Sequence, residues 1–97
     1  MEYDWDEQKN LSNIRKHGFD FEDAHEIFAA PMLVRADTRE DYGEDRWIGV
    51  GGFRGRVVVV VFTEPQAGMI RIISVRKALT YERKDYEKNL KDELGLT

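Results

Sequence analysis

The chain has 97 residues and no cysteine, which allows one domain with a modest core and excludes disulfide frameworks and thiolate metal sites. Hydrophobic residues make up 41% of the chain, which argues against intrinsic disorder. The acidic N-terminal segment lacks a signal-peptide core, and no apolar run approaches the roughly 20 residues of a membrane span, so we expect one soluble cytoplasmic domain, residues 1–97, that does not enter the membrane.

The net charge of −4 is unevenly distributed along the chain. Residues 1–45 contain 13 acidic and 5 basic residues, whereas residues 46–97 contain 6 acidic and 10 basic residues. This asymmetry is compatible with nucleic-acid contact on one surface only, although charge alone favours a mixed solubilising surface. The acidic total argues against tight non-specific DNA binding.

The first third of the chain predicts two helices. The short aromatic segment Tyr3–Trp5 is either an edge strand or a lid on the core. Asp6 is a suitable N-cap for a helix through Lys16, and Gly18 is a natural C-terminal stop. Apolar residues at i, i+3, i+4 and i+7 predict a second helix from Phe21 to about Ala29.

The middle of the chain predicts a sheet. Val57–Phe62 is an unbroken apolar run rich in valine, which predicts a central strand covered on both faces. Met69–Arg76 returns beside it as the second strand of a hairpin. Met32–Ala36 and Trp47–Val50 predict two further strands, joined by the charged loop Asp37–Arg46.

The C-terminal segment predicts a third helix, from Tyr81 to about Leu94, with Thr80 as its N-cap. Tyr86 lies on a narrow apolar seam of this helix. The expected fold is therefore an α+β domain with two N-terminal helices, a mostly antiparallel sheet of about four strands and a C-terminal helix.

Several familiar sites are not predicted. The glycines do not form a phosphate-binding loop that opens a helix. His17 and His25 fall in different predicted helices, so no metal site and no cofactor is expected, and His25 is read as a structural residue at the edge of the core. Ser12 and Ser74 have no evident base in the sequence.

Two arginines of the returning strand are candidates for a phosphate site. In a regular strand, Arg71 and Arg76 project from opposite faces because their separation is an odd number. Either a bulge re-aims one of them or only one belongs to the site. The alternative is a structural ion pair, for instance with Glu64 across the hairpin.

Metal-independent RNA cleavage requires the side-chain types that surround this sheet. The ribose 2′-OH attacks the phosphorus, one group accepts its proton, another protonates the leaving 5′-oxygen, and cations stabilise the phosphoryl charge. The rigid fork of arginine suits phosphate.

Two blocks of the sequence form a specific combination. The first block, Trp5-Asp6, Lys9, Asn13 and Lys16-His17-Gly18, has the pattern WDxxKxxxNxxKHG. The second block comprises Gly55-Arg56-Val57, Thr63-Glu64, Arg71-Ile-Ile-Ser-Val-Arg-Lys-Ala78, Glu82 and Tyr86. Together they resemble the BrnT family of bacterial toxins, whose partner antitoxin is BrnA. The resemblance runs from Tyr3 to Tyr86. Departures are Val75, where the family often has alanine, and Pro65, where a basic residue is common.

The resemblance implies a RelE-like toxin domain with endoribonuclease activity that stops translation. It also implies neutralisation by a ribbon-helix-helix antitoxin that binds operator DNA and represses the operon together with the toxin. The substrate would be RNA, either free or on the ribosome. The positions carried over are Lys9, Lys16, His17, Glu64, Arg71, Arg76, Lys77, Glu82 and Tyr86.

These observations give specific expectations for the site. His17 and Glu64 are the acid and base candidates, and Arg71 and Arg76 would bind phosphate. RNA would be guided by a basic set: Lys9, Lys16, Arg54, Arg56 and Lys77. Tyr86 either stacks on a base, orients a catalytic group or packs in the core. Two other functions stay open, a non-catalytic antitoxin-binding co-repressor and a stand-alone nucleic-acid-binding domain.

Overall fold

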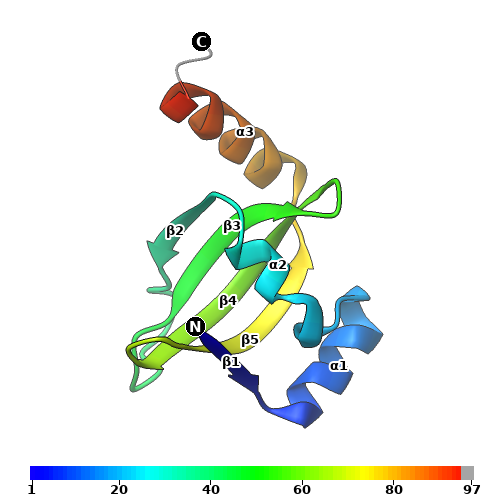
Figure 1. The fold of residues 1–97 in the computed structure, drawn as a ribbon, viewed down its shortest axis with the longest axis vertical. Coiled ribbons are helices and arrows are strands. Elements are labelled where there is room, and N and C mark those ends of the chain that lie inside the picture. The colour runs from blue at the N-terminus through cyan, green and yellow to red at the C-terminus, as the bar shows by residue number, and fades with distance from the viewer. Residues whose placement is uncertain (95–97) are drawn as a thin grey trace.

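The computed structural model describes residues 1–94, which form one sheet with helices at its face, edge and end (Figure 1). The elements in chain order are β1 (Glu2–Trp5), α1 (Glu7–His17), the 3₁₀ helix η1 (Phe21–Asp23), α2 (His25–Phe28), β2 (Met32–Ala36), β3 (Trp47–Phe53), β4 (Arg56–Gln66), β5 (Met69–Lys77) and α3 (Thr80–Leu94). The predicted α+β class is confirmed.

The sheet has the strand order β1-β5-β4-β3-β2, so the valine-rich strand is central, as predicted. All its neighbouring pairs are antiparallel except β1 and β5. The expected number of about four strands was too low by one. Of the two alternatives for Tyr3–Trp5, the edge strand is confirmed as part of β1, which pairs in parallel with Met69–Ile72, far away in the sequence.

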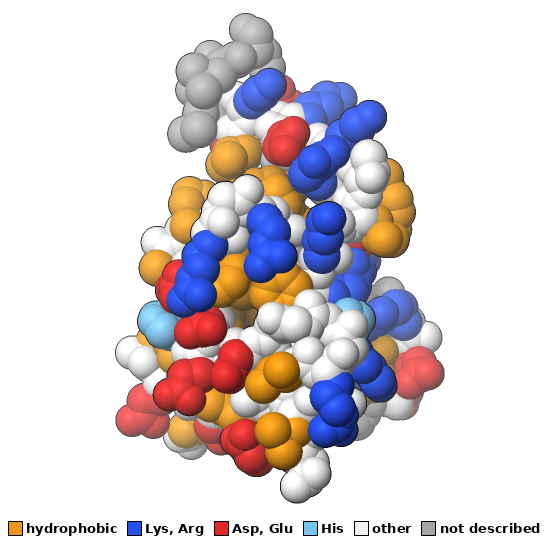
Figure 2. Space-filling model, turned by 90° about the vertical axis from the view of Figure 1, so that its right-hand side faces the viewer, with side chains coloured by type: hydrophobic (Ala, Val, Ile, Leu, Met, Phe, Trp, Pro, Cys, Tyr) orange, Lys and Arg blue, Asp and Glu red, His pale blue; other side chains and the backbone are white. Residues whose placement is uncertain are grey.

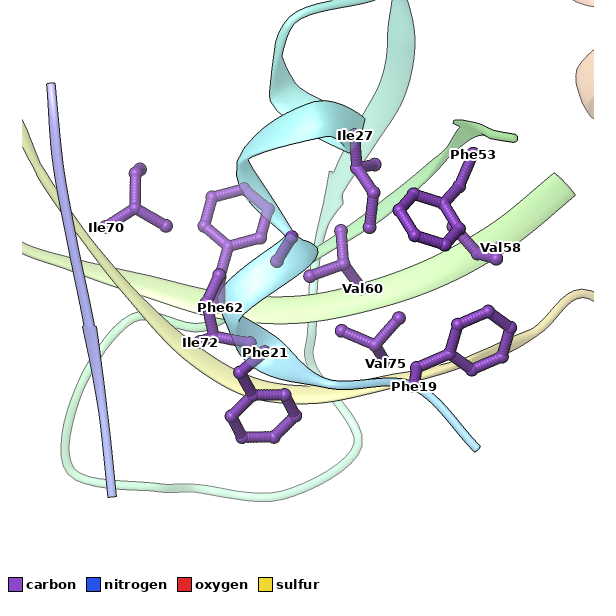
Figure 3. Packing of buried hydrophobic residues seen from close by; sticks show 11 residues of the cluster. Phe19, Phe21, Ile27, Phe53, Val58, Val60, Phe62, Ile70, Ile72 and Val75 are labelled. Carbon is purple, nitrogen blue, oxygen red and sulfur yellow. The ribbon is translucent and has the colours of Figure 1, made fainter. Parts of the chain in front are cut away.

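One face of the sheet, which we call the helical face, carries the main core. Its buried members include Val58, Val60 and Phe62 of β4 and Ile72 and Val75 of β5. Figure 3 shows these side chains meeting residues of the segment that connects α1 and β2: Phe19, Phe21 and Ile27. Burial of these apolar groups stabilises the layered arrangement.

The predicted helix over Phe21–Ala29 was wrong as a single element, because it divides into η1 and α2. Its buried residues Phe21, Ala24 and Ile27 recur every three positions. The backbone follows this period with i→i+3 hydrogen bonds from Ala24 N–H to Phe21 O and from Ile27 N–H to Ala24 O. His25 is exposed, and its Nδ1 lies 3.0 Å from Glu22 O.

Two buried asparagines of α1 attach this helix to the rest of the fold. Asn13 Oδ1 accepts from Val75 N–H at 3.1 Å, and Asn13 Nδ2 donates to the backbone oxygens of Val75 and Phe19 at 2.9 and 3.0 Å. Asn10 accepts from Phe21 N–H at 2.8 Å and donates to Asp20. Asn13 therefore pairs with the edge of β5 as a neighbouring strand would.

Strand β3 continues to Phe53, beyond the predicted end at Val50. Its pairing with β4 is regular through the glycine pair, so no bulge forms there. Instead, a Cβ at Gly51 would lie 3.2 Å from Ile27 Cγ2 and from Met32 Cβ, so glycine there permits α2 and β2 to approach closely.

Candidate functional site

A β-bulge in β5 places Arg71 and Arg76 on the same face of the sheet. Val61 pairs with Ser74 but Phe62 pairs with Ile72, which leaves Ile73 as an extra residue. Arg71 then lies opposite Thr63, and Arg76 lies opposite Val59. Val59 and Thr63 are four residues apart on β4 and share one face, so the two arginines do as well, about 13 Å apart along the strand.

We call this side of the sheet the arginine face. It is opposite to the helical face and carries a small apolar cluster of Ile48, Val59 and Val61. Arg35 of β2 belongs to the same face, since it pairs with Ile48. The bulge thus decides between the two alternatives that the sequence left open for the arginine pair.

Arg71 is held by an acidic neighbour from β1. Its Nε donates to Asp4 Oδ1 at 3.0 Å and its Nη2 donates to Asp4 Oδ2 at 3.3 Å. Both side chains are nearly half exposed, at 46% and 42%. A pair this exposed is weak, so a phosphate can compete with Asp4 for the guanidinium. The predicted partner Glu64 does not take part in it.

Arg76 connects β5 to the first turn of α3. Its two Nη atoms donate to the two carboxylate oxygens of Glu82 at 2.8 and 2.9 Å. Glu82 also accepts from Leu79 N–H at 2.8 Å, which caps the helix. The hydrogen bonds from Arg76 and Leu79 lower the pKa of Glu82 against the effect of burial. Arg76 therefore positions α3 in addition to facing the site.

The loop between β2 and β3 contributes further arginines that the sequence analysis left unassigned. Arg39 donates from Nε and Nη2 to the fully buried carboxylate of Asp37 at 2.8 and 2.7 Å. These bonds hold the pKa of Asp37 well below its usual range. The pKa of Arg76 is raised by its hydrogen bonds to Glu82, and the positive charge of Arg39 is close enough to oppose this rise.

Two buried polar atoms near Arg71 have no hydrogen-bond partner among residues 1–94. They are Thr63 Oγ1 and Arg46 Nε. Thr63 is only 2% exposed and lies beside Arg71 in the strand register. Arg46 stacks on the ring of Tyr42, with 4.0 Å from its Cζ to the ring centroid. Unpartnered buried polar atoms are rare in folded proteins, so they mark this end of the sheet.

Helix α1 places its predicted site residues on two different sides. The helical period puts Lys9 and Lys16 on one side of Asn13 and His17 on the other, together with Asn10. Asn10 contacts the segment that covers the helical face. The two lysines consequently point away from that segment, and His17 points toward it. His17 is exposed in the last turn, before the left-handed Gly18.

Glu64 is exposed on β4, directly after Thr63. This places it at the Arg71 end of the sheet, beside Phe62 and Trp47, which belong to the helical face. His17 belongs to the opposite end, because it lies one turn beyond Asn13, which bonds to Val75. The two acid–base candidates are therefore separated along the sheet, with Glu64 near Arg71.

The turn between β3 and β4 carries another part of the predicted basic set. Arg54 donates to Glu26 through Nε at 3.1 Å and through Nη2 at 2.6 Å, so it is occupied on the helical side. Arg56 and Lys77 line a hollow of about 350 Å³ together with Arg83 of α3. This hollow extends the positive surface beyond the strand.

Tyr86 is buried at 7% exposure, and its hydroxyl donates to Pro31 O at 3.1 Å. Of the roles expected for this residue, the structure supports core packing between α3 and the start of β2. Part of the predicted apolar seam, the side chain of Leu94, lies outside the described residues.

Charge is divided over the molecular surface. Figure 2 shows Asp and Glu side chains gathered at the lower left and Lys and Arg side chains mainly across the middle and upper right. In the part of the chain that the structure describes, no three His, Asp or Glu side chains are grouped to hold a metal ion. No helix within residues 1–94 is long and apolar enough to cross a membrane.

Sequence reasoning missed Arg35, Arg39 and Arg46 as members of the arginine face. The alternation of β2 was a usable signal for Arg35, but only once its pairing with Ile48 is known. Arg39 and Arg46 lie in or beside a loop without periodicity, so their side-chain directions follow from tertiary contacts.

Comparison with known proteins gives consistent results. Residues 5–82 match the family described as "Ribonuclease toxin, BrnT, of type II toxin-antitoxin system". The fold is similar to the 1.1 Å crystal structure of the Brucella abortus ribonuclease toxin, BrnT, with 32% sequence identity and a TM-score of 0.65. That match covers 82% of this chain and 99% of the Brucella chain. No protein with a curated function matches the sequence.

Proposed function

Because the chain belongs to the BrnT family of ribonuclease toxins from type II toxin–antitoxin systems, we propose that its arginine face is the RNA-cleaving site. The observation that carries the proposal is the bulge at Ile73, which brings Arg71 and Arg76 onto one face. Their separation of about 13 Å allows the long side chains to contact one phosphate or two neighbouring phosphates of a single strand.

The proposed reaction needs no metal ion. The ribose 2′-OH attacks the adjacent phosphorus, the bond to the 5′-oxygen breaks, and a 2′,3′-cyclic phosphate forms. Arg71 and Arg76 stabilise the phosphoryl charge. His17 and Glu64 are the acid and base candidates, but they lie at opposite ends of the sheet, so only one of them serves a given phosphate and water performs the other proton transfer. Lys9 and Lys16 guide RNA along the exposed side of α1, and Arg56 and Lys77 extend the track.

We further propose that RNA cleavage inhibits translation in the cytoplasm and that the fold is of the RelE type. The antitoxin would be a ribbon-helix-helix protein, through which the complex contacts operator DNA. From the net charge of −4 we expect weak affinity of the isolated chain for RNA, and we propose that the ribosome aids substrate binding.

The test is cleavage of total RNA by the purified chain in the presence of a metal chelator, with mapping of the RNA ends. We expect 2′,3′-cyclic phosphate ends for the native chain and no cleavage for Arg76→Ala. Since Arg76 also holds α3, Glu82→Gln serves as the matched control. It weakens the ion pair but keeps the arginine, and it should retain most of the cleavage.

A second function is favoured by the ion pairs themselves. Arg71 and Arg76 each make two hydrogen bonds to a carboxylate, as arginines with a structural role do. The alternative is a non-catalytic toxin homologue that binds its antitoxin and acts as co-repressor. Absence of RNA cleavage, even with ribosomes present, would establish this alternative over the nuclease.

A further inference from the structure

The two strands at the ends of the sheet are β1 and β2, and β2 is the less protected of them. β1 carries two carboxylates, Glu2 and Asp4, and charged side chains on an edge strand discourage pairing with another chain. β2 carries one charge, Arg35, and its Val34 is 50% exposed. Figure 1 shows β2 along the outer side of the sheet, and no further strand among residues 1–94 pairs with its free edge.

The backbone of β2 directs the hydrogen-bonding groups of three residues toward this free edge. Asp37, the residue after β2, continues the register of the strand, and its N–H donates to Arg46 O at 2.8 Å. Hydrogen-bonded and non-hydrogen-bonded pairs alternate along an antiparallel ladder, so Ala36, Val34 and Met32 form the non-hydrogen-bonded pairs with β3. Their N–H and C=O groups therefore point away from β3, where an added strand can bond to them.

A strand added at this edge would direct alternate side chains to the two faces of the sheet. On the helical side, Val34 borders a hollow of about 680 Å³. Its lining includes three exposed carboxylates, from Glu44, Asp45 and Glu64. Their negative charge favours lysine or arginine side chains on this side of the added strand.

On the arginine face, a groove of about 600 Å³ lies between β2, β3 and α3. Its sheet side is formed by Leu33, Ile48 and Val50, and its helix side includes Tyr81, which is 70% exposed. Its charged lining has both signs: Arg35, Glu82 and Asp85. Apolar side chains of the added strand would bury apolar surface in this groove.

We propose that the free edge of β2 binds an extended segment of a partner protein as an additional strand, in which basic and apolar side chains alternate. The basic side chains face the carboxylates of the helical side, and the apolar ones face the groove beside α3. A second copy of this chain fits less well. An antiparallel pair of β2 strands would bring Met32, Val34 and Ala36 of the second copy to the acidic side, where no cation would meet the carboxylates.

The inference rests on the proposed function in one respect, which is that the antitoxin of a toxin–antitoxin pair supplies this segment. The added strand itself follows from the edge of β2 and the two surfaces that flank it. Its test therefore uses synthetic peptides and requires neither the antitoxin nor RNA.

Binding can be measured by fluorescence anisotropy with the full chain and labelled heptapeptides. One peptide alternates valine and lysine, and the other has the same composition in block order, so that both carry the same charge. We expect the alternating peptide to bind at least about tenfold more tightly, because only it presents one kind of side chain to each face. Equal affinities of the two peptides would overturn the proposed pattern.

Methylation of the peptide backbone tests strand addition directly. In an added strand, the N–H groups of one alternate set of residues point to β2, and those of the other set point to solvent. Methylating the valine nitrogens in one peptide and the lysine nitrogens in another should therefore abolish binding in one case and largely preserve it in the other. Equal affinities of the two methylated peptides would overturn backbone pairing.

Val34→Pro removes the outward N–H at the centre of β2 and keeps the ladder with β3, since edge strands accept proline where the N–H faces solvent. The affinity for the alternating peptide should fall at least about tenfold. Val34→Ala is the matched control, because it keeps this N–H, and its affinity should fall by less than about threefold. Circular dichroism checks that both variants fold.

Equal loss of affinity in the two variants would overturn the role of the backbone, and so would a folded Val34→Pro with unchanged affinity. If Val34→Pro does not fold, the methylated peptides decide, because they are tested with the native chain. Cleavage of total RNA is scored separately. Failure of peptide binding would therefore overturn the added strand and leave the ribonuclease proposal standing, and loss of cleavage would do the reverse.

Discussion

On the helical face, buried polar side chains are satisfied. Asn13 makes three hydrogen bonds to backbone atoms, and Asn10 makes two hydrogen bonds. On the arginine face, Thr63 Oγ1 and Arg46 Nε are buried without a hydrogen-bond partner within the described part of the chain, and Arg46 Nε lies 3.6 Å from Glu44 Oε1. The same five strands thus support one face whose polar contacts are complete and another with capacity left for a ligand.

The ion pairs of the arginine face also leave capacity for a ligand. Arg71 and Arg76 are held by carboxylates from β1 and α3, at the two sides of the arginine face. These pairs keep the guanidinium groups oriented while leaving them partly exposed, at 46% and 34%. An arginine whose charge is balanced by a carboxylate can therefore still bind phosphate, because the phosphate can replace the carboxylate as its partner.

The largest effect is expected on the helical face, for Asn13→Ala. The substitution removes three hydrogen bonds and leaves backbone groups of Val75 and Phe19 unsatisfied, which should lower the free energy of unfolding by about 2–4 kcal/mol. The melting temperature should fall by at least about 10 °C. Thermal unfolding monitored by circular dichroism measures this.

Asn89→Ala is the control for that substitution. Asn89 donates only to Asp85 within its own helix, and its replacement should change the melting temperature by a few degrees at most. Equal destabilisation by both variants would show that the Asn13 contacts with β5 have no special weight.

The next effect concerns catalysis on the arginine face. Arg71→Ala should reduce the rate of RNA cleavage by about tenfold to hundredfold, because it removes a charged phosphate ligand. Its stability should change by less than about 1 kcal/mol, since the pair with Asp4 is exposed. Asp4→Asn weakens the same pair but keeps the arginine, so it should retain cleavage. Loss of activity in both variants would mean that Arg71 acts through the pair and not through the substrate.

Much of the fold could be predicted because its signals are local. The valine run of β4, the capping by Asp6 and Gly18, and the turn around Gly55 each follow from a few neighbouring residues. The parallel strand β1 and the division of the second helix depend on distant partners, which no local pattern contains.

The residue types of the proposed site come from the sequence, but their geometry does not. Arg71 and Arg76 were identified as candidates, yet their common face depends on one extra residue in β5, whose position follows from pairing with β4. Asn13 was part of a recognised motif, but its role in holding β5 became evident only from the contact with Val75.

A third prediction uses pH to compare the loop that flanks the arginine face with the rest of the fold. The pKa of Asp37 is lowered in the folded chain, chiefly by its hydrogen bonds with Arg39. Its stabilising contribution is therefore present above the unfolded pKa of about 4 and is lost as the pH falls below it. Asp37→Asn should be less stable than the native chain at pH 7, and the difference should shrink by pH 3.

Urea unfolding at both pH values measures this difference. Arg39→Gln should reduce the pH dependence of stability in the same way, because it removes the hydrogen bonds that lower the pKa of Asp37. A gap between native chain and Asp37→Asn that stays constant from pH 7 to pH 3 would contradict the assigned role of the ion pair.

The smallest effect separates packing from RNA binding at Tyr86. Tyr86→Phe removes only the hydrogen bond to Pro31 O and keeps the buried ring, so the free energy of unfolding should fall by about 1 kcal/mol. RNA cleavage and oligonucleotide binding should be unchanged, because the hydroxyl joins α3 to the start of β2 and the ring is covered. If RNA binding fell while the melting temperature stayed constant, Tyr86 would belong to the arginine face and the division between the two faces would have to be redrawn at α3.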